Sequence, residues 1–292
     1  MALTKIQKFS YKYFKNIAEK RVSEKLSHKL ESAHMEIRGA VYLSVAFLML
    51  ILGIVISYVF FLIFIFLLLP MMGITIDLLT TIIFLILPVI IGVIIFFVYL
   101  ILPASRAKTR GKKIDIDLPY ALNFVSAMSS AGVTPTEIFN SLSKQDIYGE
   151  IREESAWIFR DVTLLGVDIL NAIKNNIKRT PSEKFGEFLQ GMIVTVASGG
   201  SLKSYFIAKA NQFMIENRQK QKELFETLGI MAESYVTAAV AGILLLLIVI
   251  PIMMIISGDA SQLSFLYIII FLIVPMIHMG FAFVIKGMTL EV

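Results

Sequence analysis

The sequence predicts an all-α, polytopic membrane protein with four transmembrane helices, arranged as two hairpins that flank a six-helix cytoplasmic domain. Three observations lead to this fold class: an apolar composition, four long runs without charge, and the confinement of nearly all lysine and arginine to two other segments. Apolar residues make up 57% of the 292 residues and charged residues 17%. Soluble domains average about 45–50% and about 25%, so an ordinary soluble protein is excluded.

Four runs of the chain contain no aspartate, glutamate, lysine or arginine. They cover residues 40–69, 78–102, 236–257 and 264–285. A helix needs about 20 apolar residues to cross a hydrocarbon core about 30 Å thick, so each run predicts one transmembrane helix. Prolines in or beside these runs do not argue against helix, because neighbouring helices in a membrane re-satisfy the freed backbone groups.

The distribution of lysine and arginine predicts the orientation in the cell membrane. Residues 1–39 carry nine of the 27, residues 103–235 carry seventeen, and the connections 70–77 and 258–263 carry none. Cytoplasmic segments are enriched in these cations, so both termini and the central domain are predicted in the cytoplasm. The predicted organisation is a basic amphipathic N-terminal helix (1–38), a hairpin (39–102), the central domain (103–235), a second hairpin (236–286) and a tail (287–292).

The N-terminal segment has apolar residues three to five positions apart, with lysines between them. This spacing predicts a basic amphipathic helix. Two interpretations stay open: the helix lies on the cytoplasmic leaflet, or it packs on the central domain of the same chain. The apolar positions are Ile6, Phe9, Tyr13, Ile17, Val22, Leu26 and Leu30.

Residues typical of helix starts and ends in the central domain predict six helices, at about 118–130, 135–144, 148–164, 169–179, 182–197 and 202–232. Asp117 is predicted to cap the first helix. Thr134 with Glu137, and Thr180 with Glu183, each match the capping-box spacing with proline between them.

Glycines separate the predicted helices into three αα-hairpins. Gly132 and Gly166 mark the first two turns, and the pair Gly199 and Gly200 marks the third. Within the last helix, residues 216–223 contain no apolar residue. This polar stretch must face water or a polar partner.

No catalytic, cofactor or metal site is predicted, so the chain is not expected to be an enzyme. The sequence has no phosphate-binding Gly-Lys-Ser/Thr loop and no cysteine. His28, His34 and His278 are too scattered to form a metal site. His278 is the one titratable residue in an apolar run, and a hydrogen bond to a backbone carbonyl or to another helix is preferred over a proton relay. Trp157 is expected in the core.

A cationic cluster directly follows the second apolar run. Such clusters set topology and contact lipid headgroups, and this interpretation is preferred over a specific partner site. The net charge of +5 has the same explanation, so no nucleic-acid partner is predicted. The cluster consists of Arg106, Lys108, Arg110, Lys112 and Lys113.

Four segments of the central domain carry a resemblance to a known family. They read Asp-Ile-Asp-Leu-Pro-Tyr-Ala-Leu-Asn-Phe at 115–124, Ser-Ala-Gly-Val-Thr-Pro-Thr-Glu at 130–137, Arg-Thr-Pro-Ser-Glu-Lys-Phe-Gly-Glu-Phe-Leu-Gln-Gly at 179–191, and Ser-Gly-Gly-Ser-Leu-Lys-Ser-Tyr-Phe at 198–206. Together with the flanking hairpins they resemble the F-domain family of type II secretion and type IV pilus systems, most closely its archaeal pilus, archaellum and tight-adherence branch. The resemblance covers about 115–235.

The resemblance implies a non-enzymatic membrane assembly platform without a cofactor. Such a platform couples a hexameric cytoplasmic ATPase to the insertion of pilin-like subunits, and pairs with another copy or a paralogue in the bilayer. Many members carry two such domains and this chain carries one, so it is either a single-domain member or part of a longer protein. Exposed charge near the turns and in the polar stretch is predicted to contact the ATPase: Arg152, Glu153, Lys203, Arg218, Lys220 and Lys222.

Two other classes of function were weighed. A secondary transporter or channel places polar groups or broken helices near the bilayer midplane, and the four runs contain no carboxylate or lysine. A membrane signalling scaffold using the helical domain is the remaining alternative.

Overall fold

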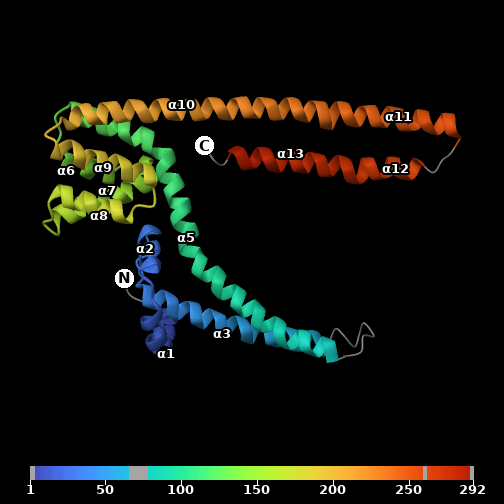
Figure 1. Cartoon of the computed structure of the whole chain (residues 1–292), viewed down its shortest axis with the longest axis horizontal. Coiled ribbons are helices and arrows are strands. Elements are labelled where there is room, and N and C mark those ends of the chain that lie inside the picture. The colour runs from blue at the N-terminus through green and yellow to red at the C-terminus, as the bar shows by residue number, and fades with distance from the viewer. Residues whose placement is uncertain (1–3, 66–77, 259–261, 290–292) are drawn as a thin grey trace. The chain divides into compact units, whose positions relative to one another are not determined.

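The computed structural model describes residues 4–65, 78–258 and 262–289, and in these ranges it contains helices and turns without a strand (Figure 1). The predicted connection 70–77 lies outside the described residues, as do residues 259–261 of the connection 258–263. The chain divides into two compact units, Met1–Ile207 and Ala208–Val292. Each unit is described by itself.

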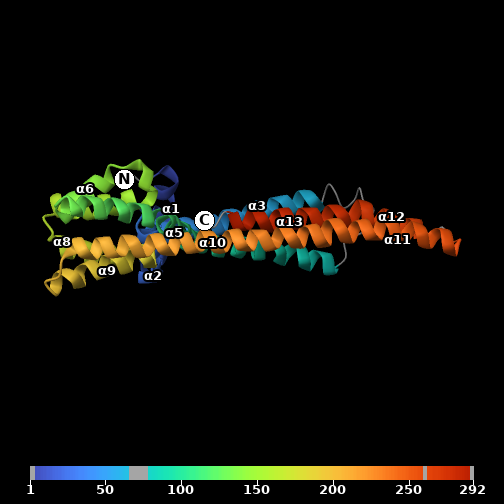
Figure 2. The ribbon, with the colours of Figure 1, turned by 90° about the horizontal axis from the view of Figure 1, so that it is seen from above.

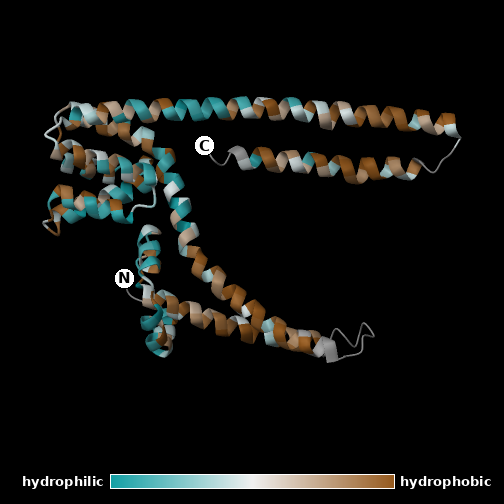
Figure 3. Cartoon of the chain, in the orientation of Figure 1, coloured by the Kyte–Doolittle hydropathy of each residue, from teal (hydrophilic) through white to brown (hydrophobic). Residues whose placement is uncertain are grey.

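In the described part of the chain, four helical segments are long and apolar enough to cross a membrane. They are Gly39–Ile63, Phe84–Ser130, Leu202–Ser257 and Leu263–Gly287. At most 17% of the residues in their most apolar windows are buried within the protein, so these hydrophobic surfaces (brown in Figure 3) are left for lipid. The prediction of an all-α, polytopic membrane protein is confirmed.

The N-terminal segment forms two helices, α1 (Lys5–Arg21) and α2 (Glu24–Ser32), so the prediction of one helix is wrong. The chain is extended at Val22, and the Ser23 hydroxyl caps α2 by accepting the Lys25 N–H at 3.3 Å. α2 packs against α5 and α8 with Leu30 buried, whereas α1 packs along α3 (Gly39–Ile63). Of the two interpretations of the N-terminal segment, packing on the protein's own helices is therefore correct for α2.

Helix α5 (Leu78–Ser130) continues without a break from the first hairpin into the central domain (Figure 1). The predicted helix start at Asp117 is wrong, because Asp117 lies inside α5. Pro103 has no N–H to bond the carbonyl of Tyr99 one turn earlier, and the Tyr42 hydroxyl of α3 donates to that carbonyl at 2.7 Å. A contact from the neighbouring helix thus satisfies the group that Pro103 leaves free.

Small residues bring α3 and α5 close together. A Cβ atom on Gly92 would lie 2.3 Å from the Ile54 side chain. Near the same level, the Ser57 hydroxyl contacts the carbonyls of Ile54 and Pro88 at 3.0 and 3.2 Å. Close packing of small residues with interhelical hydrogen bonds is typical of helix pairs in lipid.

The central helices are α6 (Pro135–Ser143), α7 (Gly149–Thr163), α8 (Ile169–Arg179), α9 (Glu183–Ala197) and α10 (Leu202–Tyr235), with a short 3₁₀ turn, η2 (Asp146–Tyr148), before α7. α6 packs against α7, and α8 lies beside α9 (Figure 2). The predicted ranges agree with these helices to within a few residues, apart from the one merged into α5. Large buried side chains of the core include Leu118, Leu122, Ile138, Leu142, Ile151, Ile158, Ile173, Phe185 and Phe188.

Three glycine turns connect these helices. Gly132, Gly166 and Gly199 have φ angles of 82°, 64° and 71°, in the left-handed region that side chains with a Cβ disfavour. Thr134 lies at the N-cap of α6 and its hydroxyl accepts the Glu137 N–H at 3.5 Å. The Glu137 carboxylate accepts from Asn140, so its side chain does not complete the predicted box.

The second predicted capping box, Thr180 with Glu183, is wrong. Ser182 caps α9 by accepting the Phe185 N–H at 3.0 Å, and Glu183 is the first residue of the helix. Thr180 instead ends α8. The Ser182 hydroxyl also donates to the Asp115 carboxylate of α5, so the cap of α9 is held by a contact with a distant part of the chain.

In the second unit, α10 continues through a π-helical turn, η3 (Val236–Ala241), into α11 (Gly242–Ser257). The returning helix comprises α12 (Gln262–Ile268), the π-helical turn η4 (Ile269–Ile273) and α13 (Val274–Thr289). His278 Nδ1 donates to the Val274 carbonyl at 2.8 Å, and its ring meets Tyr235 edge to face. The predicted bond to a backbone carbonyl is confirmed.

Candidate functional site: a buried ion network and the clefts around it

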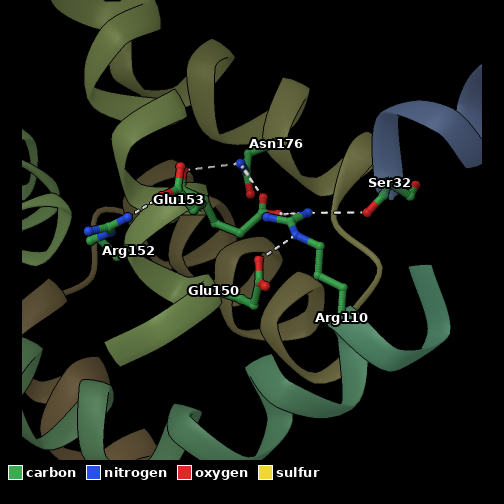
Figure 4. A network of polar contacts seen from close by, with 7 residues as sticks. Ser32, Arg110, Glu150, Arg152, Glu153 and Asn176 are labelled. Carbon is green, nitrogen blue, oxygen red and sulfur yellow. Dashed lines mark hydrogen bonds and ion pairs between the residues drawn. The ribbon is translucent and has the colours of Figure 1, made fainter. Parts of the chain in front are cut away.

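Arg110 of α5 is the centre of a buried ion network (Figure 4). Its side chain is 5% exposed, with Nε 2.7 Å from Glu150 Oε2 and Nη1 2.7 Å from Glu154 Oε1, both on α7. The prediction that Arg110 contacts lipid headgroups is therefore wrong. Arg110 lies on the face of α5 that packs against α7, and its charge pairs with glutamates inside the domain.

The network joins four helices. Arg110 Nη1 also donates to the Ser32 carbonyl at the end of α2, at 3.2 Å, and Asn176 Nδ2 of α8 donates to Glu154 Oε2 at 2.8 Å. Burial raises the pKa of Glu154 above its usual value, although the Arg110 charge opposes the shift. Each of these polar groups depends on the others, because a buried charge without a partner costs several kcal/mol, about 3–5 when one member of a pair is removed.

Trp157 of α7 extends the network as a stacking surface. The Arg179 guanidinium lies 4.2 Å from its ring centroid, the Arg110 guanidinium 5.6 Å, and the His34 ring 4.4 Å. Cations over an indole face are stabilised by the ring quadrupole. Arg179 also pairs with Asp161 at 3.5 Å. Trp157 therefore contacts charged groups rather than the apolar core that the sequence predicted.

The sequence analysis did not predict a role for Glu150 or Glu154, the acidic partners of Arg110. Glu154 lies three residues after Ile151 and four before Ile158, and all three side chains are fully buried. A charged residue on the apolar face of a helix was the available signal, since such a residue needs a buried partner. Nothing local to α7 identifies Arg110 as that partner.

The other members of the cationic cluster, Arg106, Lys108, Lys112 and Lys113, are exposed. Arg106 and Lys113 line a cleft of about 280 Å³ beside the end of α2. For these four residues, contact with lipid headgroups stays a prediction.

A second cleft, of about 400 Å³, lies between α5 and the start of α7, and two predicted partner-binding residues line it. Arg152 pairs there with Asp146 and, at 2.6 Å, with Glu153. Asp117 lies on the opposite wall, where burial raises its pKa. Acidic side chains outnumber basic ones in the lining: Asp117, Asp146, Glu150 and Glu153 against Lys113 and Arg152.

The remaining predicted partner-binding residues lie elsewhere. Lys203 donates to the Ser130 carbonyl at the end of α5, at 3.4 Å, in the first unit. Arg218, Lys220 and Lys222 are exposed on the polar stretch of α10, in the second unit. Lys222 lies 3.8 Å from Glu226, one turn further on. The structure thus gives three separate charged surfaces.

Within the described ranges, no group of three or more histidine, aspartate or glutamate side chains is placed to hold a metal ion. The polar groups brought together here make ion pairs and hydrogen bonds with one another. Their arrangement fits the joining of helices and the contact of a charged partner.

Comparisons with known proteins agree with this architecture. Residues 121–250 match the family model described as type II secretion system protein F, so the match begins within α5 and ends within α11. The protein MJ1286 of Methanocaldococcus jannaschii, described as uncharacterized, is 32% identical over 145 residues, which are 50% of this chain and 24% of that protein. The match thus spans about a quarter of the length of that relative. No solved structure matches the chain. The central part of this chain, residues 121–250, is therefore similar to type II secretion system protein F.

Proposed function

We propose that this protein is a membrane assembly platform of a type IV pilus, archaellum or type II secretion-like machine. The observation that carries the proposal is the match of residues 121–250 to the protein F family model, in a chain with four helices long and apolar enough to span a membrane. The platform itself catalyses no reaction. It transmits the work of a cytoplasmic hexameric ATPase to pilin-like subunits in the bilayer.

The charged surfaces of the domain and the lipid-facing spans suit these two partners. Polar surface rich in unburied charge recognises a partner by complementary charge, which speeds encounter and weakens with salt. The spans expose apolar side chains along most of their length, as required for contact with the apolar helices of pilin-like subunits and with another platform copy or a paralogue.

The proposed topology places both termini and the central domain in the cytoplasm, with two short connections outside. The chain has no cysteine, so a single introduced cysteine gives a clean signal. Gly73→Cys and Ser261→Cys should react with an impermeant maleimide added to intact cells, whereas Gln145→Cys, on the exposed turn before η2, should react only after lysis. Labelling of Gln145→Cys in intact cells would reverse the assignment.

Binding of the ATPase tests the function directly. The full chain, tagged and extracted in mild detergent, should retain the secretion ATPase of the same organism and should hydrolyse no ATP alone. Deletion of residues 115–230 should remove the ATPase from the preparation. ATP hydrolysis by the purified chain, or equal ATPase recovery after the deletion, would rule out the proposed role.

A further inference from the structure

Helix α1 leaves an apolar stripe uncovered. Ile6, Phe9, Tyr13 and Ile17 are 58%, 57%, 64% and 49% exposed. They are three or four positions apart and therefore share one face of the helix. Bulky apolar side chains gathered on one exposed face mark a contact with another molecule or with a membrane.

A different face of α1 holds the helix against α3. Ser10 and Ala18 are fully buried there, and the hydroxyls of Ser10 and Ser44 are 3.3 Å apart. The rings of Phe14 and Phe47 pack beside them, with their centroids 6.2 Å apart. Because this face already fixes α1 on α3, the exposed stripe is available for something else.

Between the stripe and α3 lies a groove of about 370 Å³ without polar lining surface. Phe9 and Tyr13 form one wall, and Leu48, Ile51, Leu52 and Val55 of α3 form the other. These α3 residues belong to the charge-free segment predicted to cross the bilayer. The groove therefore borders the apolar surface of α3 that is predicted to face lipid.

A row of lysines borders the stripe. Lys5, Lys8 and Lys12 each precede a stripe residue by one position, which places them about 100° around the helix from it. In the described part of the chain these three lysines make no ion pair. A cationic row beside an apolar face is the arrangement by which helices bind anionic membrane surfaces.

We propose that the groove between α1 and α3 binds an acyl chain of an anionic phospholipid, with the headgroup phosphate held by Lys5, Lys8 and Lys12. The apolar walls exclude the polar headgroup, and the lysines supply the complementary charge at the edge. The site is independent of ATPase binding, so its failure leaves the proposed platform function untouched.

The test uses tryptophan fluorescence of the full chain in nanodiscs that hold one copy each. Phe9→Trp places a reporter in the groove, Val59→Trp places one on the exposed face of α3 beyond it, and the parent chain with Trp157 supplies the background. The discs contain phosphatidylcholine with the same fraction of either brominated phosphatidylglycerol or brominated phosphatidylcholine. Bromine quenches tryptophan only at close range.

The Phe9→Trp signal should be quenched at least twofold more by the brominated anionic lipid, whereas Val59→Trp should be quenched equally by both. Adding Lys5→Glu, Lys8→Glu and Lys12→Glu should remove the preference at Phe9→Trp while the circular dichroism spectrum stays the same. Equal quenching of Phe9→Trp by the two lipids would overturn the proposal. Absence of quenching by either would also overturn it, because the groove would then hold no lipid.

Discussion

Replacing Arg110 by methionine is expected to lower the free energy of unfolding by about 3–5 kcal/mol, the usual cost of removing one partner of a buried ion pair. Glu154 would stay fully buried without its cation, and the contact of α5 with the Ser32 carbonyl of α2 would be lost. Thermal unfolding of the full chain in detergent, followed by circular dichroism, measures the loss.

Lys108→Met is the matched control, because Lys108 is a nearby exposed cation on the same helix. It should leave the unfolding temperature unchanged. Adding Glu154→Leu to Arg110→Met should restore part of the stability, since the unpaired charge is then gone.

The loss of stability in Arg110→Met should also shrink as the pH is lowered. Burial raises the pKa of Glu154, so protonation favours the folded state at low pH and this stability disappears as the pH rises through that pKa. If Arg110→Met unfolded at the parent temperature, the network would contribute nothing to stability.

Reversing three cations on α10 is expected to abolish recovery of the secretion ATPase. Arg218, Lys220 and Lys222 are exposed on a stretch of helix without an apolar residue, so their replacement by glutamate disturbs no core. Complementary charge across an interface fixes partner choice and raises the association rate, and like charges in its place cost several kcal/mol. Co-purification from cells that carry the native ATPase gives the readout.

A control with the same change of charge separates a specific surface from a general electrostatic effect. Lys144, Lys174 and Lys178 are exposed cations of the first unit, and their reversal to glutamate should leave ATPase recovery intact. Equal loss in both variants would show that net charge, rather than the α10 surface, governs binding. Full recovery in the α10 variant would place the ATPase elsewhere on the domain.

Local signals in the sequence were sufficient for the ends of most helices. Gly132, Gly166 and Gly199 mark turns because only glycine adopts their positive φ without strain, and Thr134 caps α6 through a bond three residues away. Such features depend on neighbours in the chain. The charge-free runs were equally sufficient for the four spans, because burial in lipid depends on composition over a whole segment.

The errors arose where distant residues decide local structure. Asp117 was predicted to cap a new helix, yet α5 runs through this residue and packs against α7 and α9. Ser182, which caps α9 in place of Thr180, is hydrogen-bonded to Asp115 of α5. Arg110 is buried rather than exposed because it pairs with Glu154 on a different helix. The periodicity and spacing of residues in the sequence carry no information about such pairings. They also do not show which charged surfaces contact a partner.

The continuity of α5 has a mechanical consequence. At 1.5 Å per residue its 53 residues give a path of about 80 Å along the helix. The apolar part of the helix lies in the first hairpin and the far end lies in the core of the central domain. The helix bends along its course (Figure 1) and contains Pro88, Pro103 and Pro119. Because its backbone is unbroken, a rotation of the domain end about the helix axis is passed along the helix to the part in the hairpin, whereas the bends change the direction in which a push is delivered. The azimuth of the first hairpin in the bilayer is thereby tied to the azimuth of its half of the cytoplasmic domain.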